Sequence, residues 1–264
     1  MNHRIQGKTV MITGASGGLG EQIARLSGKS GANLVLLARN EQKLEKLKGE
    51  LEAKYPIKVW TIGADVGNKE ALEGALAKID EQVDTIDILV NNAGFGKFKT
   101  VLDLDLLDAE NMFKVNVLGL VMITKWILPK MVEKKQGHII NIASMAGKIA
   151  TPKSAVYAAT KGAVLSFSDS LRMEVKDHGV FVTTVNPGPI ATNFFDVADD
   201  TGTYLKNVGR WVLKPEFVAE KVVAKMMSNT REINLSKVME LGSRLYRLSP
   251  SLVEKIGKKA FFKK

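Results

Sequence analysis

Residues 9–20 of the chain read TVMITGASGGLG, an apolar run of strand length that passes through a glycine-rich turn into a helical pattern. Glycine lets the backbone turn sharply and lets its N–H groups approach a ligand closely. A helix that begins inside such a turn favours a pyrophosphate at its N-terminus. The turn therefore predicts a dinucleotide site with the candidate binding residues Gly14, Ser16, Gly18, Leu19 and Gly20. A tight turn without a ligand is the alternative, whereas a triphosphate-binding loop is excluded because Glu21 and Gln22 follow instead of Lys and Ser/Thr.

Outside this stretch, apolar runs alternate with amphipathic segments of helix length. Strands are predicted at Thr9–Thr13, Asn33–Ala38, Val59–Ala64, Ile86–Val90, His138–Ile142 and Val180–Val185, with a short seventh near Ile233–Leu235. Helices are predicted at Gly18–Ser30, Glu41–Lys54, Lys69–Gln82, Asp108–Glu133, Ser154–His178 and Pro215–Ser228. Nearly continuous Val, Ile and Leu indicate parallel strands covered on both faces. The pattern predicts an α/β protein with a three-layer, doubly wound, Rossmann-like fold, a mostly parallel seven-stranded sheet, and a ligand crevice at the carboxyl ends of the strands.

Composition fits one folded domain. The chain has 264 residues, 45% of them hydrophobic and 25% charged, and it contains no cysteine. A disulfide scaffold, a thiol nucleophile and a cysteine-ligated zinc site are thereby excluded, and His3, His138 and His178 show no metal-ligand spacing, so we expect no metal. No run reaches about 18 apolar residues and no signal peptide is recognisable, so we expect a cytoplasmic protein. We place one catalytic domain at residues 1–235, with residues 236–264 as its basic C-terminal extension.

The end of the second predicted strand indicates which dinucleotide is bound. An NAD-binding site would place Asp or Glu there for the ribose 2′-hydroxyl, whereas this chain has Ala38 followed by Arg39. A planar guanidinium can pair with a 2′-phosphate, so we predict NADP(H). Arg39 as a solvated strand-end residue is the alternative.

Polar residues also follow the third and fourth predicted strands. Asp65 and Val66 follow the third, and residues 91–94 read NNAG after the fourth. Short polar groups at these positions can bind the adenine edge or merely fix turns. We include Asp65, Val66, Asn92, Ala93 and Gly94 among the cofactor-binding candidates, and leave Asn91 open between binding and stabilising its own loop.

A second constellation carries the candidate chemistry. Tyr157 and Lys161 are four residues apart in a helical pattern and so share one face. Ser144 follows the fifth predicted strand, which places it near the same crevice. A phenol, an ammonium and a hydroxyl beside a dinucleotide fit proton and hydride transfer at a carbonyl.

Together these motifs resemble the classical short-chain dehydrogenase/reductase family over about residues 6 to 235. The resemblance implies a catalytic tetrad of Asn116, Ser144, Tyr157 and Lys161, with Pro187, Gly188 and Ile190 beside the nicotinamide. It also implies that Tyr157 is the acid, that Ser144 polarises the carbonyl, and that Lys161 binds the nicotinamide ribose. For Asn116 it implies a backbone kink and a held water, and for the assembly a homodimer or homotetramer through the two long helices.

The substrate is expected to be apolar, because Phe194, Phe195, Tyr204 and Trp211 lie where the family carries its substrate loop. The stretch Asn92–Gly96 and the basic tail look closer to reductases of steroid-like or long-chain acyl ketones than to those of acyl-carrier proteins. A non-catalytic NADP-binding or regulatory protein is the alternative.

The formal net charge of +10 is concentrated at the C-terminus. Residues 236–264 hold eight Lys or Arg against two Glu, which is +6 of the total. Apolar residues from Leu241 to Phe261, interrupted by Ser249 and Pro250, predict two amphipathic helices. These could cover the cleft or a subunit interface with their cations outward, or rest on an anionic membrane as a peripheral contact. We expect no nucleic-acid partner, because no recognition motif accompanies the charge.

Overall fold

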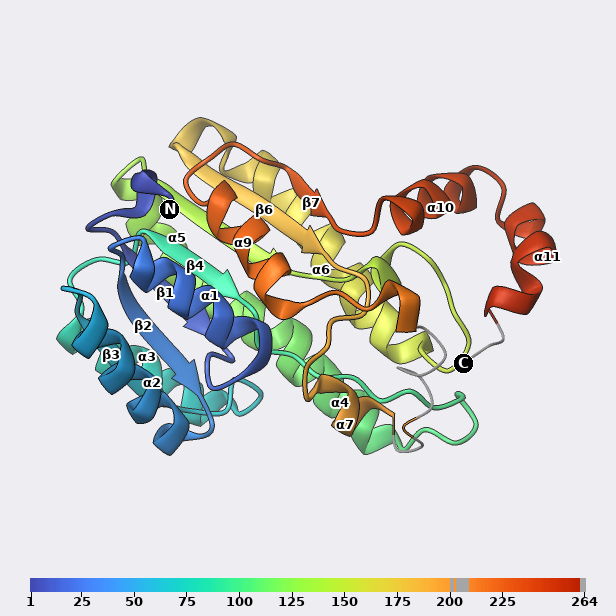
Figure 1. Ribbon diagram of the computed structural model, residues 1–264, viewed down its shortest axis with the longest axis horizontal. Helices are drawn as coiled ribbons and strands as arrows, with labels where there is room; N and C mark the ends of the chain where they lie inside the picture. Colours follow the sequence, from blue (N-terminus) through green and yellow to red (C-terminus); the bar gives the residue numbers. More distant parts are fainter. Residues whose placement is uncertain (200–201, 203–208, 262–264) are drawn as a thin grey trace.

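The computed structural model describes residues 1–199, 202 and 209–261. Its centre is a seven-stranded sheet in the order β3-β2-β1-β4-β5-β6-β7 (Figure 1). The strands are β1 (Thr9–Thr13), β2 (Asn33–Ala38), β3 (Val59–Gly63), β4 (Ile88–Asn91), β5 (Gly137–Ile142), β6 (Val180–Asn186) and β7 (Glu232–Asn234). Every pairing is parallel, which confirms the predicted Rossmann-like class. The strand order reverses between β1 and β4, where the crevice of such a sheet opens.

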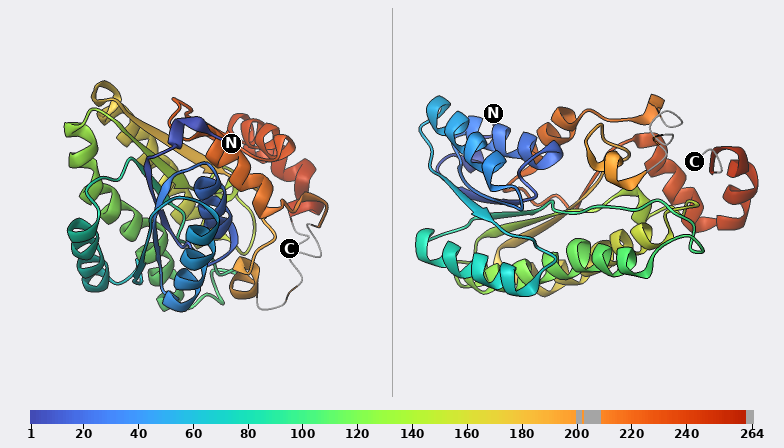
Figure 2. Two further views of the ribbon diagram at one scale, coloured as in Figure 1. Left: turned by 60° about the vertical axis from the view of Figure 1, so that its left-hand side comes forward. Right: turned by 90° about the horizontal axis from the view of Figure 1, so that it is seen from below.

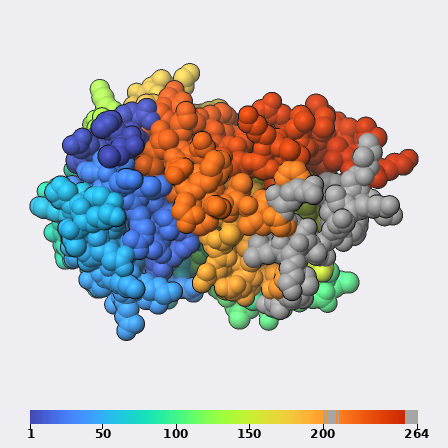
Figure 3. All heavy atoms as spheres, in the orientation of Figure 1, coloured from blue at the N-terminus to red at the C-terminus, as the bar shows by residue number. Residues whose placement is uncertain are grey.

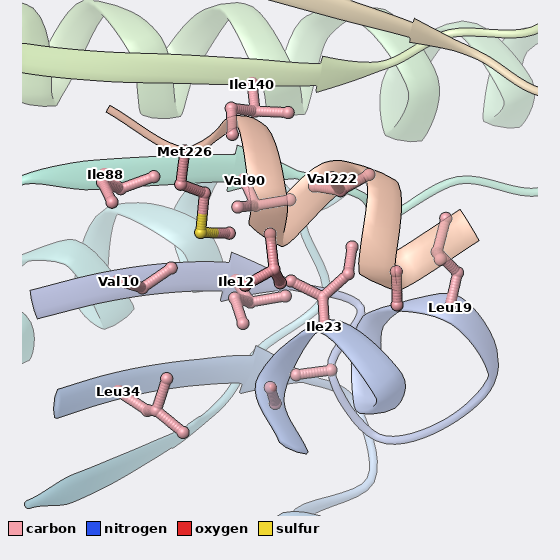
Figure 4. Packing of buried hydrophobic residues seen from close by; sticks show 14 of the residues in the cluster. Val10, Ile12, Leu19, Ile23, Leu34, Ile88, Val90, Ile140, Val222 and Met226 are labelled. Carbon is pink, nitrogen blue, oxygen red and sulfur yellow. The ribbon is translucent and has the colours of Figure 1, made fainter. Parts of the chain in front are cut away.

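Helices cover both faces of the sheet, giving the three layers seen edge-on in Figure 2. One face carries α1 (Gly18–Lys29), α2 (Glu41–Lys54) and α9 (Pro215–Lys225), and the other carries α3 (Lys69–Gln82), α5 (Leu120–Glu133) and α6 (Ala155–Glu174). Because side chains alternate along a strand, Val10 and Ile12 pack toward α1 and α9 while Met11 packs on the opposite face. Figure 4 shows Ile12, Ile23 and Val222 meeting in the first of these two cores.

The longest predicted helix contains an irregular turn that the sequence did not reveal. The predicted range Asp108–Glu133 is occupied by α4 (Leu106–Phe113), a π-helical segment (Lys114–Gly119) and α5. The helix starts two residues earlier than predicted because the Asp105 side chain accepts a hydrogen bond from the Leu107 N–H and caps it. A π segment inside an α-helix is rare and often marks a functional position.

Among the described residues, one helical segment, Leu106–Glu133, is long and apolar enough by length and composition to cross a membrane. Lys125 and Lys130 interrupt its apolar run, which is why counting uninterrupted residues did not find it. Its Ile123, Ile127 and Met131 are buried in the core beneath the sheet. The segment is therefore a core layer of this domain.

The remaining predictions differ in smaller ways. The predicted helix Ser154–His178 ends as α6 at Glu174 and is followed by a separate 3-10 turn, Lys176–His178. The irregular stretch 187–214 contains a short helix, α7 (Phe194–Ala198), and a 3-10 turn, Gly209–Trp211, whereas Tyr204 lies outside the described residues. The tail forms two helices as predicted, α10 (Lys237–Leu248) and α11 (Pro250–Phe261).

Candidate active site

A cleft of about 1300 Å³ opens at the carboxyl ends of the strands. It brings together most of the residues predicted from the sequence, which come from loops far apart in the chain. Those that line it are Gly14, Ser16, Gly18, Leu19, Arg39, Asn92, Ala93, Gly94, Ser144, Tyr157, Lys161, Pro187, Gly188 and Ile190. Four predicted residues, Gly20, Asp65, Val66 and Asn116, are outside this lining.

The glycine turn has the backbone that close ligand approach requires. Gly14 and Gly18 have φ of +66° and +56°, in the left-handed region that L side chains rarely adopt. A Cβ on Gly20 would lie 2.3 Å from the Gly14 carbonyl oxygen. Because Gly20 has no side chain, helix α1 can pack closely against the turn. The Asn92 Nδ2 donates to the Thr13 carbonyl at 2.9 Å and holds the turn from the neighbouring strand end.

These features fit an extended dinucleotide. The cleft extends along the carboxyl ends of the strands, from Arg39 and the glycine turn to Tyr157 and Lys161. A Cβ on Gly14 would lie 3.0 Å from the Asn92 Nδ2 and one on Gly18 would lie 3.2 Å from the Thr192 Cγ2, so both positions need glycine. A Cβ on Gly94 would stand 3.5 Å from the Lys161 Nζ, so this glycine keeps the space beside the ammonium open.

Cations gather at the adenosine end of the cleft. Arg39 is exposed, and its Nη1 lies 3.9 Å from the Asp65 Oδ2, a loose pair that leaves the guanidinium available. Lys43 and Lys46 on α2 line the same cleft. The sequence reasoning missed both lysines because it treated α2 as a solvated face. The Asn40 side chain caps α2 by accepting from the Lys43 N–H at 2.9 Å. This cap sets where the helix begins, and Asn40 was therefore the sequence signal for the direction of these lysines.

Asp65 and Val66 have local structural roles. The Asp65 Oδ1 accepts from the Gly67 N–H at 2.8 Å and forms a turn after β3. Val66 is buried, and its carbonyl oxygen would lie only 2.4 Å from a Cβ added to Gly119. Their cofactor contacts stay predictions. Asn91 is also buried, at the end of β4, and it donates to the Thr124 hydroxyl on α5 and to the Asn141 amide oxygen on β5, so these bonds tie the strand to its neighbours rather than stabilising the loop of Asn91 itself.

Helix α6 places Tyr157 and Lys161 on the face that borders the cleft. The Lys161 Nζ lies 5.8 Å from the centre of the Tyr157 ring and donates to the Ile142 carbonyl at 2.9 Å. Both side chains are buried. Burial penalises the ammonium and lowers the pKa of Lys161 to about 8. The lysine is thus a desolvated cation held beside a phenol.

Ser144 stands at the end of β5 on the same side of the cleft. Its extended backbone, with φ of −172°, starts a 3-10 turn, and its Oγ accepts from the Ala146 N–H at 3.0 Å. That bond uses an oxygen lone pair and leaves the hydroxyl proton able to point at a carbonyl. The Ser144 hydroxyl can therefore act as a donor while its oxygen accepts from the backbone.

Asn116 lies in the π segment and is 1% exposed. Its Nδ2 donates to the Phe95 carbonyl at 2.8 Å and to the Thr160 Oγ1 at 3.1 Å, and its Oδ1 accepts from the Phe95 N–H at 2.9 Å. The Asn116 side chain therefore makes these three hydrogen bonds to protein groups. It joins α6 to the segment that follows β4, next to Gly94.

Aromatic rings enclose Tyr157. The centres of the Phe98 and Phe194 rings are each 5.7 Å from the centre of the Tyr157 ring, and Phe195 packs edge-on against Phe194 at 5.2 Å. The Phe98 N–H donates to the Ala198 carbonyl at 2.8 Å and ties this wall to α7. Phe194, Phe195 and Trp211 were predicted to serve the substrate, and all three line the cleft. Phe95 was used in the sequence analysis only as part of the stretch Asn92–Gly96, and Phe98 was missed, although the sequence FGKF directly after NNAG carried the signal.

Comparison with known proteins identifies the family of this chain. A family model described as short chain dehydrogenase matches residues 8–201. The chain belongs to the short-chain dehydrogenase family. It is 34% identical over 269 residues to Dehydrogenase/reductase SDR family member 7B of Bos taurus, covering 96% of this chain and 81% of the relative. It is 36% identical over 194 residues to the NADP-dependent 3-hydroxy acid dehydrogenase of Schizosaccharomyces pombe, covering 72% of this chain and 74% of that protein.

A solved structure of a reductase has a similar fold. The L-sorbose reductase of Gluconobacter frateurii, complexed with NADPH and L-sorbose, superposes with a TM-score of 0.80 at 27% identity and covers 89% of this chain and 97% of that one. Membership in this family makes the chain an oxidoreductase that acts on CH–OH or C=O groups with a nicotinamide cofactor.

Proposed function

We propose that this short-chain dehydrogenase is an NADP(H)-dependent enzyme that interconverts a carbonyl and a secondary alcohol on an apolar substrate, of steroid-like or long-chain acyl type. The observation that carries the proposal is the composition of the cleft. One end holds Arg39, Lys43 and Lys46, besides an Arg25 that is paired with Glu21 and Glu50, and the other holds Tyr157 among Phe98 and Phe194. A polar end for a phosphorylated cofactor and an aromatic end for the substrate meet at the reacting groups.

A bound nicotinamide dinucleotide supplies a hydride to the carbonyl carbon. Negative charge then builds on the substrate oxygen, and the chain must meet it with groups already in place. Ser144 donates a hydrogen bond to that oxygen, and Tyr157 transfers the proton from its phenol. In the reverse direction Tyr157 accepts the proton and Ser144 holds the alcohol.

Lys161 makes the phenol acidic enough to act. Moving a phenol pKa from about 10 to about 7 requires roughly 4 kcal/mol in favour of the phenolate. The Lys161 Nζ lies 5.8 Å from the centre of the Tyr157 ring, and an ammonium at that distance supplies about 3 kcal/mol of it at an effective dielectric near 20. In the alcohol-forming direction the proton lost by Tyr157 is restored through Lys161. Asn116 supports this relay by holding the Phe95 backbone that closes one side of the site.

The preference for NADP(H) rests on the adenosine end. A 2′-phosphate placed there would meet Arg39 and two lysines, whereas a 2′-hydroxyl would find no carboxylate at position 38 or 39. Dissociation constants for NADPH and NADH, measured by quenching of protein fluorescence, test this. We expect NADPH to bind more tightly, and Arg39→Ala to weaken NADPH by about tenfold or more without affecting NADH. Tighter NADH would overturn the preference.

The reaction is tested with a panel of steroid-like, long-chain acyl and small polar ketones and alcohols, using each cofactor in turn. Apolar ketones should be reduced best, and Tyr157→Phe should abolish turnover while NADPH still binds. Wild-type-like turnover in that variant would falsify the role of Tyr157. No NADPH oxidation by the wild type on any carbonyl would favour the non-catalytic alternative.

A homodimer or homotetramer is proposed as the assembly. Phe113 and Leu118 on the long helical segment and Met173 on α6 are exposed by 39%, 60% and 73%. These are the two helices through which the family commonly pairs. Light scattering of the full chain gives the mass, and Leu118→Asp should reduce it.

A further inference from the structure

Helix α10 presents its large apolar side chains to solvent. Val238, Leu241, Leu245 and Leu248 are exposed by 60%, 61%, 50% and 83%. Their spacing of three, four and three residues places them in one stripe along the helix. Leu252, on the first turn of α11, is exposed by 53%. We call these five residues the leucine stripe.

The opposite face of α10 is the one that packs on the domain. Ser243 is buried, with its hydroxyl bonded to the Glu240 carbonyl at 2.7 Å, and Gly242 and Met239 line the cleft. The helix therefore turns Met239, Gly242 and Ser243 toward the protein, whereas its three leucines face solvent. A contiguous apolar surface left exposed in this way marks an interaction site.

Cations accompany the stripe. Lys237 and Arg247 on α10 are exposed, as is Lys255 on α11. The sequence places Lys258 and Lys259 further along the same helix, and residues 236–264 carry a net charge of +6. A second copy of this chain would bring the same positive surface against it, at an electrostatic cost. A negatively charged partner is complementary to it.

The position of the stripe is consistent with a broad, flat partner. Figure 1 shows α10 and α11 extending beyond the sheet at the end where the strands terminate, and Figure 3 shows them as a lobe at that end. Val238 belongs both to the stripe and to the lining of the cleft. A surface covering the stripe would therefore lie beside the cleft mouth.

We propose that α10 and α11 form an interfacial anchor that binds the surface of an anionic phospholipid membrane. The leucine stripe enters the boundary between headgroups and acyl chains, and the lysines and arginines beside it bind the lipid phosphates. An amphipathic helix with a basic polar side binds membranes by this combination of apolar burial and charge. The anchor places the open cleft next to the bilayer.

The test is co-sedimentation of the full chain with vesicles of phosphatidylcholine alone and of phosphatidylcholine with phosphatidylserine. We expect the chain to sediment with the phosphatidylserine vesicles, and the bound fraction to fall as salt is raised. Replacing two surface cations, Lys237→Gln with Arg247→Gln, should weaken binding by about 30-fold. The double substitution Leu241→Asp with Leu245→Asp should abolish it.

Matched controls separate the anchor from general charge and from misfolding. Lys69→Gln with Lys78→Gln removes two cations from α3 and should leave vesicle binding unchanged. Thermal unfolding of the leucine variant should match that of the wild type, because both leucines already face solvent. Neither readout needs catalysis, so the anchor and the proposed reaction can fail separately.

Three outcomes would overturn the proposal. The first is equal, salt-insensitive binding to both vesicle types. The second is full vesicle binding by the leucine variant. The third is no vesicle binding by the wild type together with a smaller mass of the leucine variant in light scattering, which would assign the stripe to contact between copies of the chain.

Discussion

The amide of Asn116 holds the peptide groups on both sides of Phe95: its Oδ1 accepts from the Phe95 N–H at 2.9 Å and its Nδ2 donates to the Phe95 carbonyl at 2.8 Å. The two residues are 21 positions apart in the chain. One side chain thus fixes the segment between β4 and α4 against the π segment. That segment carries Gly94, next to Lys161, and Phe98, next to Tyr157.

Replacing Asn116 by Ala should therefore lower both stability and turnover. The Phe95 groups are left without their partner in a part-buried site, at about 1–3 kcal/mol for each unsatisfied group. Thermal unfolding measures that loss, and we expect kcat to fall by more than tenfold because the reacting groups lose their support. Thr160→Val leaves both Phe95 bonds in place while removing the third Asn116 bond and the bond from the Thr160 hydroxyl to the Tyr157 carbonyl, so kcat should fall less than in Asn116→Ala. An Asn116→Ala enzyme with wild-type kcat would contradict the positioning role.

Gly96 is packed against the reacting ring. A Cβ at this position would lie 3.0 Å from the Tyr157 Cδ2 and 3.0 Å from the Phe194 Cζ. Gly96→Ala should push both rings by a few tenths of an ångström and lower kcat, while NADPH affinity stays unchanged because the glycine turn is remote. Steady-state kinetics and cofactor titration measure the two effects.

Gly74 provides the matched control, because nothing lies within 4 Å of a Cβ added there and it sits inside α3. Gly74→Ala should keep full activity and stabilise the protein by up to about 1 kcal/mol. If Gly96→Ala were equally active, the rings would have more room than the packing indicates.

The fold could be predicted from the sequence because the patterns that indicate it are local and recur along the chain. Buried parallel strands need continuous apolar runs, and the glycine turn at Gly14 identifies where the first crossover begins. Six of the seven strands appear within about two residues of their predicted ends, and Ile233–Leu235 falls within one residue of β7. The same reasoning located Tyr157 and Lys161, because residues four positions apart in a helix lie on the same face.

What the sequence could not supply were contacts between distant segments. The bonds from Asn116 to Phe95, the ring of Phe98 over Tyr157, and the direction in which α2 points Lys43 all depend on tertiary packing. The tail shows the same limit. Periodicity predicted its two helices and left open whether they cover the cleft, form an interface or rest on a membrane, and only packing shows that α10 turns its leucines outward. The cytoplasmic location and the domain boundary at residue 235 stay predictions.

His138 should make stability depend on pH. It is fully buried in β5, where its Nδ1 accepts from the Met227 N–H at 2.9 Å and its Nε2 lies 2.8 Å from the Thr183 Oγ1. Burial lowers the pKa of His138 to about 3. The unfolded chain, with a histidine pKa of about 6.5, binds the proton first, so folding stability is lost as pH falls below about 6.5.

This residue alone should cost up to about 1.4 kcal/mol per pH unit between pH 6 and pH 4, because each unit of pKa difference has that value. His138→Gln, which keeps one hydrogen-bonding end, should start less stable at pH 7 and lose less on acidification. The check is the difference between the two unfolding free energies across that pH range. A constant difference would show that the histidine titrates normally in the folded protein.

Lys161 should lower the stability of the folded protein while supporting turnover. Burial lowers its pKa to about 8 from the ordinary 10.5, so the ammonium is a cost to folding at neutral pH, and that cost is relieved as pH rises from 8 toward 10.5. Lys161→Met removes the buried charge and should be at least as stable as the wild type at pH 7, with the advantage shrinking above pH 8. The shift corresponds to about 3 kcal/mol, less the lost bond to the Ile142 carbonyl.

The same variant should have almost no turnover, because the neutral thioether leaves the Tyr157 phenol at its ordinary acidity. In the wild type, carbonyl reduction should fall as pH rises through about 8 and Lys161 loses its proton. Unfolding free energies at pH 7 and above pH 9, together with the pH profile of kcat/KM, measure both effects. A Lys161→Met protein that is much less stable at pH 7 yet turns over normally would reverse the assignment, since the lysine would then hold the fold together and take no part in proton transfer.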